Sequence, residues 1–481
     1  MTKVGLAFGH AASNYGDIAI NEGVQAMCAA SDDLDLHRVA VLRLRDAYSD
    51  ALFDSLRDGS AGVRVIITDD DADAEAALLA RYLREPSAFL SDAGFDDVDL
   101  VALNSGEHLF EAENGANTLD LIWRVLPAIA AAEAGLAAVQ MPATVGPFRT
   151  AFGTQIIETL RAATQLSTRE DNSFDYLVDS FGAEPARLLD PAFFCDASGE
   201  GEPTRTGNEF PARVGLVLRL ENFGLRAGKQ RSAQISARMR TSGHRDSKAF
   251  GAFRDIARRL AERGTQITLI VQTMADRGLT QNLHDDLAEQ FPDQIRVADP
   301  GSLHGFRRVL GEQELVIASR FHACILAIAE GVPAIGTYTP SHGPKMPGLY
   351  RSLGFPEGAV IIGDRIAESV GEEVLAVLPA AMDGFARVQG RVQELKADAV
   401  GWLDRPETRR PRGAGPLADD RLALMHELLR FSAARSDDDR DQKLRSMQRR
   451  VRTLEDRVDV LQALAGSPAQ SSPAGSAPSA D

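Results

Sequence analysis

The sequence predicts an α/β fold with two Rossmann-like, open parallel-sheet domains that face a cleft. Short runs of Val, Ile and Leu alternate with amphipathic or alanine-rich stretches along most of the chain, and this alternation is typical of βαβ units. The length of 481 residues exceeds what a single hydrophobic core usually supports. Together these observations favour two consecutive domains over one large one.

Short apolar runs in both halves of the chain are the predicted strands. They cover residues 3–8, 36–42, 63–68, 99–103 and 137–141, and then 213–219, 266–271, 294–297, 314–318 and 334–338. The predicted helices between them include 17–30, 119–134 and 323–330. An N-terminal domain is expected over 1–195, a polar linker over 196–210, a C-terminal domain over 211–380, and further helices over 381–434.

The C-terminal tail differs in composition from the two domains. A charged segment begins at residue 435, and apolar residues then recur at spacings of three and four, as in a coiled-coil seam. These residues are Leu444, Met447, Val451, Leu454, Val458 and Leu461. We expect a short coiled coil within 435–465, a homo-oligomer formed through 444–461, and a disordered Ser-, Pro- and Ala-rich end at 466–481.

Composition and charge exclude several classes of function. The net charge of −17 argues against a nucleic-acid partner, which needs a basic surface. Cys28, Cys195 and Cys324 lack the spacing of metal ligands, so a reducing compartment and no metal site are expected. No apolar run is long enough for a transmembrane segment, and no signal-peptide pattern is visible. We expect a protein of the cytoplasm or of the inner face of the membrane.

Cationic side chains follow the predicted strands of the second half at their carboxyl ends. They are Arg219, Arg320, His322 and Lys345, with Phe321 between two of them. Ligands of open parallel sheets bind beyond these strand ends. Guanidinium, imidazole and helix-terminal amide groups gathered there would bind an anion. The alternative is structural, in which Arg320 pairs with a core carboxylate and His322 caps the next helix.

A basic loop covers residues 226–248, shortly after Arg219. Its cations include Arg226, Lys229, Arg231, Arg238 and Arg240. Electrostatic capture of an anionic substrate is one interpretation of this loop. A solvated surface loop is the simpler interpretation for most of these cations. Arg219 is the exception, because it ends a strand as Arg320 does.

Two strand-end loops of the first half carry polar side chains that would face the same cleft. Asn14 and Asp17 stand at a predicted helix start, where Asp17 is an N-cap or first-turn acid or a ligand for a hydroxylated substrate. Glu107 and His108 lie in the loop "NSGEHLF" at 104–110 and are interpreted as acid/base groups or as turn residues. The spacing matches neither a dinucleotide fingerprint nor a P-loop.

In their order along roughly residues 1–365, these motifs resemble those of the polysaccharide pyruvyl transferase family. The matching residues are Asn14, Gly16 and Asp17 for N-x-G-D, Gly146 to Phe148 for GPF, Arg169 to Ser173 as a rough match for R-x-x-S, Asp190 to Phe193 for DPAF, Arg219 for a strand-ending arginine, Arg320 to Ala323 for R-[LF]-H-A, Gly331 to Pro333 for G-V-P, and Pro344 with Lys345 for P-K. The loop 104–110 stands where the family usually has a glycine-rich one.

The resemblance implies a glycosyltransferase-B-like fold and transfer of pyruvate from phosphoenolpyruvate to a sugar of a cell-surface glycan or its lipid-linked precursor. The products would be a pyruvyl ketal and phosphate, without a cofactor or metal. The implied donor-binding residues are Arg219, Arg320, Phe321, His322 and Lys345. His322 would be the catalytic acid that protonates the enol carbon. The candidate acceptor-binding residues are Asn14, Asp17, Glu107 and His108.

Two other functions fit the same residues. A nucleotide-sugar-dependent glycosyltransferase of the same two-lobed fold would place a diphosphate near Arg320 and Lys345. A non-catalytic member of the family would instead use its C-terminal coil as an interaction module.

Overall fold

The computed structural model describes residues 1–11, 14–43, 62–67, 72–112, 115, 117–195, 210–219, 244–245, 247–340, 345–405, 407–408, 410–411, 417–434 and 447. Several sequence-based predictions lie outside these residues: nearly all of the linker, the basic loop 226–248 apart from residues 244, 245, 247 and 248, Pro344, and the coiled coil apart from Met447. Contacts divide the chain into two units, Met1–Glu427 and Leu428–Asp481. All of the strands described below belong to the first unit, and the predicted domain boundaries stay predictions.

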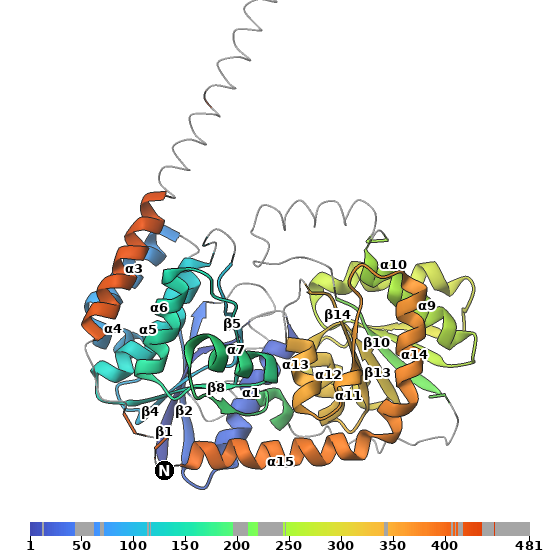
Figure 1. Cartoon of the computed structure of the whole chain (residues 1–481), viewed down its shortest axis with the longest axis horizontal. Coiled ribbons are helices and arrows are strands. Elements are labelled where there is room, and N and C mark those ends of the chain that lie inside the picture. The colour runs from blue at the N-terminus through green and yellow to red at the C-terminus, as the bar shows by residue number, and fades with distance from the viewer. Residues whose placement is uncertain are drawn as a thin grey trace, which may run out of the picture. The chain divides into compact units, whose positions relative to one another are not determined.

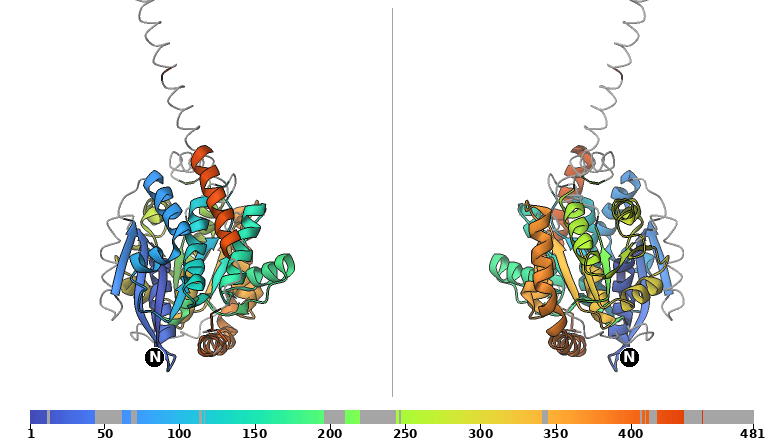
Figure 2. Two further views of the ribbon diagram at one scale, coloured as in Figure 1. Left: turned by 90° about the vertical axis from the view of Figure 1, so that its left-hand side faces the viewer. Right: turned by 90° about the vertical axis from the view of Figure 1, so that its right-hand side faces the viewer.

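The first sheet has five parallel strands in the order β3-β2-β1-β4-β6. They are β1 (Thr2–Gly9), β2 (Leu34–Arg43), β3 (Gly62–Ile67), β4 (Leu100–Leu103) and β6 (Ala137–Gln140). Strand β4 is buried along its whole length, as expected where helices cover both faces of a parallel sheet. Figure 2 shows β1 to β3, in blue, side by side. The five strands predicted for the first half are confirmed.

The second sheet has six parallel strands in the order β12-β11-β10-β13-β14-β15. They are β10 (Arg213–Val217), β11 (Gln266–Ile270), β12 (Ile295–Ala298), β13 (Leu315–Ala318), β14 (Ala334–Tyr338) and β15 (Ala359–Ile361). This is the strand order of the Rossmann fold. The predicted α/β class with two Rossmann-like sheets is therefore confirmed, and β15 is the strand of this sheet that was not predicted.

A third, smaller sheet was also not predicted. Its parallel strands are β5 (Gly106–Leu109), β7 (Ala143–Val145), β8 (Ser167–Thr168) and β9 (Ala186–Arg187). Strand β5 contains Glu107 and His108, so the interpretation of these two as turn residues is wrong. The pairing of β5 with β7 shifts register between Gly106 and Leu109, so Glu107 and His108 lie at an irregularity of the strand.

Helices connect the strands of both large sheets (Figure 1). In the first half they are α1 (Tyr15–Ala29), α3 (Ala72–Arg84), α4 (Pro86–Ala93), α5 (Thr118–Glu133), α6 (Ala151–Ala163), α7 (Asp171–Phe181) and η2 (Pro191–Phe194). In the second half they are α9 (Lys248–Ala261), η4 (Met274–Asp276), α10 (Arg277–Ala288), α11 (Leu303–Gly311), α12 (Phe321–Ala329), α13 (Lys345–Ser352), η6 (Pro356–Gly358), α14 (Ala367–Asp383) and α15 (Phe385–Asp404). Residues 417–427 of the first unit and 428–434 of the second are also helical.

Contacts between helices join the halves of the first unit. Helix α1 packs on η2 and also on α11 and α12 of the second half. Helix α13 packs on α7, where Arg351 Nη2 donates to Asp175 Oδ2 at 2.5 Å and Ser352 Oγ donates to Asp171 Oδ1 at 2.9 Å. These contacts bring the start of α1 and the start of α7 to the strand ends of the second sheet.

Candidate functional site

The strand order of each large sheet reverses at one place, between β1 and β4 in the first and between β10 and β13 in the second. Ligands of doubly wound sheets bind at such topological switch points, beyond the carboxyl ends of the strands. Arg219 follows β10 and Arg320 follows β13, and the N–H of Arg219 donates to Oγ of Ser319 at 2.7 Å. Two of the predicted donor-binding residues therefore lie at the second switch point.

Arg320 pairs with a core carboxylate, as the structural alternative predicts. Its Nε donates to Oδ2 of Asp276 at 2.8 Å, and its Nη2 lies 2.6 Å from the same oxygen. Nη2 also donates to Oγ1 of Thr273 at 3.1 Å. The Asp276 side chain is buried, so this pairing holds the guanidinium in one orientation. The other half of that alternative is wrong, because Arg320 and not His322 is the N-cap residue of α12.

Arg169, Asp190 and His322 form a buried row of charged and polar side chains. Nη1 of Arg169 donates to Oδ2 of Asp190 at 2.6 Å, and Nε2 of His322 lies 3.6 Å from the same oxygen. The other carboxylate oxygen of Asp190 accepts from the N–H of Ala192 at 2.8 Å. The side chains are 1% exposed for Arg169, 0% for Asp190 and 9% for His322. The start of η2 thus places a carboxylate directly beside the imidazole.

Asp190 stays ionised in this row. Burial raises the pKa of its carboxyl group, but the guanidinium of Arg169 and the hydrogen bonding of His322 outweigh burial and lower the pKa to about 2. At neutral pH the side chain is therefore a carboxylate. A carboxylate beside a histidine fixes the orientation of the ring and stabilises an imidazolium when one forms.

Helix α1 brings its N-terminus to His322. A Cβ built on Gly16 would lie 2.4 Å from Nδ1 of His322, so glycine leaves room for the ring. Oδ1 of Asn14 accepts from the N–H of Gly16 at 3.1 Å and from Nε2 of Gln272 at 2.9 Å. Asp17 lies in the first turn of the helix. In the structure, the N-x-G-D motif therefore starts a helix and positions the imidazole.

Lys345, at the start of α13, is ion-paired with Glu107 of β5. Its Nζ lies 5.6 Å from the centre of the Phe321 ring, and the guanidinium carbon of Arg169 lies 4.7 Å from the same centre. Burial lowers the pKa of Lys345 to about 8; Glu107 opposes this change, while Arg219 and Arg169 add to it. Lys345, Arg219 and Arg169 therefore lie close enough together beside the second switch point to repel one another.

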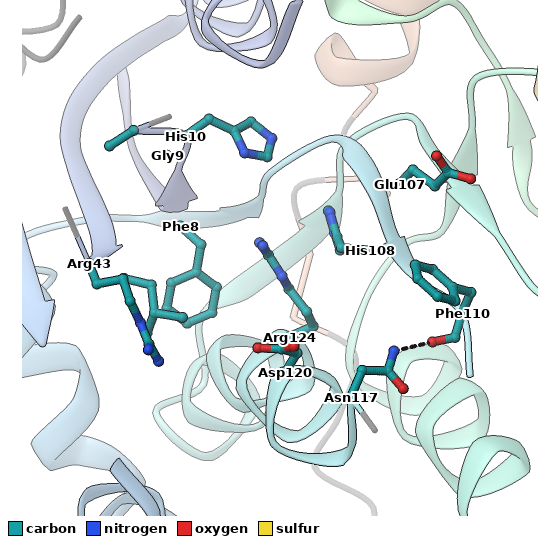
Figure 3. A pocket seen from close by; sticks show the side chains of 12 residues that line it. Phe8, Gly9, His10, Arg43, Glu107, His108, Phe110, Asn117, Asp120 and Arg124 are labelled. Atoms are coloured by element: carbon teal, nitrogen blue, oxygen red, sulfur yellow. Dashed lines mark hydrogen bonds between the residues drawn. The ribbon is translucent and has the colours of Figure 1, made fainter. Parts of the chain in front are cut away.

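A pocket of about 240 Å³ lies at the switch point of the first sheet. Among the residues that line it are Phe8, His10, Glu107, His108, Asp120 and Arg124. Figure 3 shows the side chains of His10, His108 and Arg124 pointing toward the same space from the end of β1, from β5 and from α5. Two of the candidate acceptor residues, Glu107 and His108, thus line the pocket, whereas Asn14 and Asp17 are not among its lining residues.

His10 and His108 approach each other across Gly106. A Cβ built there would lie 2.9 Å from Nδ1 of His108 and 3.2 Å from Nε2 of His10. Nδ1 of His108 is buried and has no hydrogen-bond partner among the described residues. Burial lowers the pKa of both imidazoles; Arg124 lowers both further, and Asp17 partly opposes the change at His10. Both rings are therefore neutral at physiological pH.

Other kinds of site find no support in the described part of the chain. Within it, no group of three or more His, Cys, Asp and Glu side chains is placed to hold a metal ion. None of its helices combines the length and the apolar character needed to cross a membrane. Burial raises the pKa of all three cysteine thiols to about 12, so none of them is a thiolate nucleophile at neutral pH.

Sequence-based reasoning assigned no role to Arg169, Asp190, His10 or Arg124. Arg169 and Asp190 belong to the R-x-x-S and DPAF motifs, and the acid inside the apolar run "LLDPAFF" was a usable signal, because buried carboxylates need a cationic partner. His10 follows the first strand directly and could have been found by the strand-end rule. Arg124 lies inside a helix and had no such signal.

The comparison with known families confirms the resemblance that the motifs indicated. The sequence model described as polysaccharide pyruvyl transferase matches residues 14–341. The chain belongs to the polysaccharide pyruvyl transferase family. The matched region contains Asn14, Glu107, Asp190, Arg219 and His322, whereas Lys345 lies just beyond it. A search of curated proteins found no match.

Solved structures with a similar fold include UDP-N-acetylglucosamine 2-epimerases. One of them is 12% identical, with a TM-score of 0.51, and the match covers 84% of this chain and 96% of that chain. The enzyme from Neisseria meningitidis, bound to UDP-GlcNAc, is 9% identical, with a TM-score of 0.50, and the match covers 84% of this chain and 99% of that chain. At this level of identity the likeness concerns the fold alone, and it supports the predicted glycosyltransferase-B-like class.

Proposed function

We propose that this protein transfers the pyruvyl group of phosphoenolpyruvate to a sugar of a cell-surface glycan or of its lipid-linked precursor. The methylene carbon of the donor takes up a proton, and a sugar hydroxyl adds to the enol carbon. The bond from that carbon to the phosphate oxygen then breaks, and a second hydroxyl closes the ketal. The products are a pyruvyl ketal and inorganic phosphate. Membership of the polysaccharide pyruvyl transferase family supports this reaction.

The observation that carries the proposal is the group of cations at the second switch point. Phosphoenolpyruvate has both a carboxylate and a phosphate, and guanidinium groups bind either of them through paired hydrogen bonds. We assign the donor to Arg219, Arg320 and Lys345. The Nε and Nη2 atoms of Arg320 are held by Asp276 and Thr273, so Nη1 is the nitrogen that we assign to the donor.

His322 is the proposed proton donor for the methylene carbon. It follows Arg320 by two residues, and the ring of Phe321 between them supports Lys345 and Arg169. The carboxylate of Asp190 stabilises the imidazolium, which is the acidic form of the ring. A positioned general acid of this kind contributes roughly 10²- to 10⁴-fold to the rate.

The decisive experiment is to incubate the protein with phosphoenolpyruvate and chemically defined glycan intermediates. We expect a pyruvyl ketal on one of the glycans by mass spectrometry, with release of an equal amount of phosphate. Stabilisation by nucleotide sugars but not by phosphoenolpyruvate, together with sugar transfer, would instead identify a glycosyltransferase. Absence of both donor binding and phosphate release would identify a non-catalytic member of the family.

Donor binding should weaken as the pH rises through about 8. The pKa of Lys345 in the free protein is lowered to about 8, so its ammonium group is charged below this pH and neutral above it. Calorimetric titration with phosphoenolpyruvate on both sides of this pH measures the effect. Lys345→Arg is the matched control, because a guanidinium stays charged throughout the range. Wild type and Lys345→Arg with the same pH dependence would show that another group titrates.

A further inference from the structure

We propose that the pocket at the first switch point binds the sugar that receives the pyruvyl group, and that Glu107 accepts the proton of the attacking hydroxyl once the donor has drawn Lys345 away from it. This inference rests on the proposed function. It defines the ligand class of the pocket as a single uncharged, hydroxylated sugar ring, and it adds a second catalytic residue to His322.

The size and lining of the pocket fit one sugar ring. Its volume of about 240 Å³ lies below the roughly 300–1,000 Å³ that is typical for drug-sized ligands. The rings of Phe8 and Phe110 provide apolar surface, and His10, His108 and Asp120 provide polar groups. Small apolar walls with a few convergent polar groups are the usual features of a ligand site.

The protonation state of the two histidines favours an uncharged ligand with hydroxyl groups. A neutral imidazole offers one N–H donor and one nitrogen acceptor, which suits a hydroxyl group better than an anion. The buried Nδ1 of His108, without a partner among the described residues, would gain a hydrogen bond from such a ligand. The lining also contains two carboxylates, Glu107 and Asp120, and two guanidinium groups, Arg43 and Arg124, so its formal charges cancel and give no net attraction for an anion.

Glu107 belongs to both switch points. It lines the pocket of the first sheet and is ion-paired with Lys345 of the second half. Lys345 in turn lies in the electrostatic field of Arg219 and Arg169. A sugar in the pocket would therefore place a hydroxyl against Glu107. Glu107 in turn contacts Lys345, which we assign to the donor.

The ion pair makes the two sites depend on each other. Without donor, the charge of Lys345 holds the Glu107 carboxylate and makes it a poor base. The phosphate of phosphoenolpyruvate is the stronger partner for Lys345, since it carries more charge than one carboxylate. Donor binding therefore frees Glu107 to accept a hydrogen bond from the acceptor hydroxyl, and the donor should bind before the acceptor.

The proton balance of the reaction closes with these two residues. His322 gives one proton to the methylene carbon, which becomes a methyl group. The first hydroxyl oxygen bonds to the enol carbon while its proton passes to Glu107, and this proton leaves with the phosphate as hydrogen phosphate. The second hydroxyl closes the ketal, and its proton restores the imidazolium of His322.

Glu107→Gln tests this inference because it should change binding and turnover in opposite directions. Without the competing carboxylate, Lys345 is available to phosphoenolpyruvate, so calorimetry should show donor binding about tenfold tighter than in wild type. Without the base, kcat for ketal formation should fall by roughly 10²- to 10⁴-fold. Glu107→Asp, which keeps a carboxylate, should recover part of the turnover.

Asp120→Asn is the matched control for donor binding. It also removes one carboxylate from the lining of the pocket, but the salt bridges found among the described residues do not join Asp120 to Lys345, so phosphoenolpyruvate should bind as in wild type. A Glu107→Gln protein that binds the donor no more tightly than wild type, or that keeps wild-type turnover, would overturn this inference but not the proposed function. A wild-type protein that binds no phosphoenolpyruvate and forms no ketal would overturn the proposed function as well, before any variant is compared.

Discussion

Replacing Asp190 with alanine is expected to lower the free energy of unfolding by about 3–5 kcal/mol. The reason is the guanidinium of Arg169, whose side chain is 1% exposed and which Asp190 contacts at 2.6 Å. Without Asp190 this charge stays buried with no carboxylate beside it, which is the costly way to break a buried ion pair. Chemical denaturation of wild type and variant at neutral pH measures the difference.

Two further variants separate the loss of this ion pair from a general effect of truncation. Glu394→Ala breaks the surface pair of Arg391 and Glu394, whose side chains are 39% and 67% exposed, and should change the free energy of unfolding by only about 0–1 kcal/mol. The double variant Arg169→Met/Asp190→Leu removes both buried charges and should be more stable than Asp190→Ala. If Asp190→Ala were as stable as wild type, the buried pair would contribute nothing to the fold.

The stabilising effect of Asp190 should also depend on pH. Its pKa is about 2 in the folded protein, against an ordinary value of 3.8. A lowered folded-state pKa gives stability that is fully present above the ordinary value and is lost as the pH falls through the folded value. The difference in stability between wild type and Asp190→Ala should therefore shrink as the pH falls from about 4 toward 2.

The strands of the two large sheets were predictable because their signal is local. A parallel strand covered on both faces is a short, continuous apolar run, and β13 (Leu315–Ala318) is an example. The same rule located Arg219, Arg320 and His322, because residues directly after such a run lie at the ligand-binding edge of the sheet. The small sheet was missed because β8 and β9 have two residues each, too few for any periodicity.

The partners of the site residues were not predictable, because they come from distant parts of the chain. Asp276 is 44 positions from Arg320, and Glu107 is 238 positions from Lys345. A sequence pattern says which residue needs a partner, through the cost of a buried charge, but the partner follows only from the packing of the helices. The structural and functional interpretations of Arg320 are therefore compatible. Asp276 binds Nε and Nη2 of the guanidinium, and the proposed donor binds Nη1.

His322→Gln is expected to lower kcat by roughly 10²- to 10⁴-fold while leaving the fold and much of the donor binding intact. An amide in this position keeps a polar donor near Oδ2 of Asp190, which lies 3.6 Å from Nε2 of His322, and is similar in size to the imidazole that packs against Gly16. The ion pair of Arg169 and Asp190 does not involve the substituted side chain. The amide has no proton to give to the methylene carbon, and the chemical step should therefore become limiting. Ketal formation by mass spectrometry and donor binding by calorimetry, measured on the same preparation, give the two quantities to compare.

The control for this substitution is His284→Gln in helix α10, where the imidazole is 27% exposed and contacts Asp285. It changes the same functional group outside both switch points and should leave ketal formation at the wild-type rate. The pattern that identifies a general acid is normal phosphoenolpyruvate binding with a large loss of kcat in His322→Gln alone. If His322 served only to pack against Gly16, the result would differ. Stability and donor affinity would then fall together, and turnover per bound donor would be unchanged. That outcome would assign His322 to the packing of α1 against α12 and leave the proton donor of the reaction to another residue.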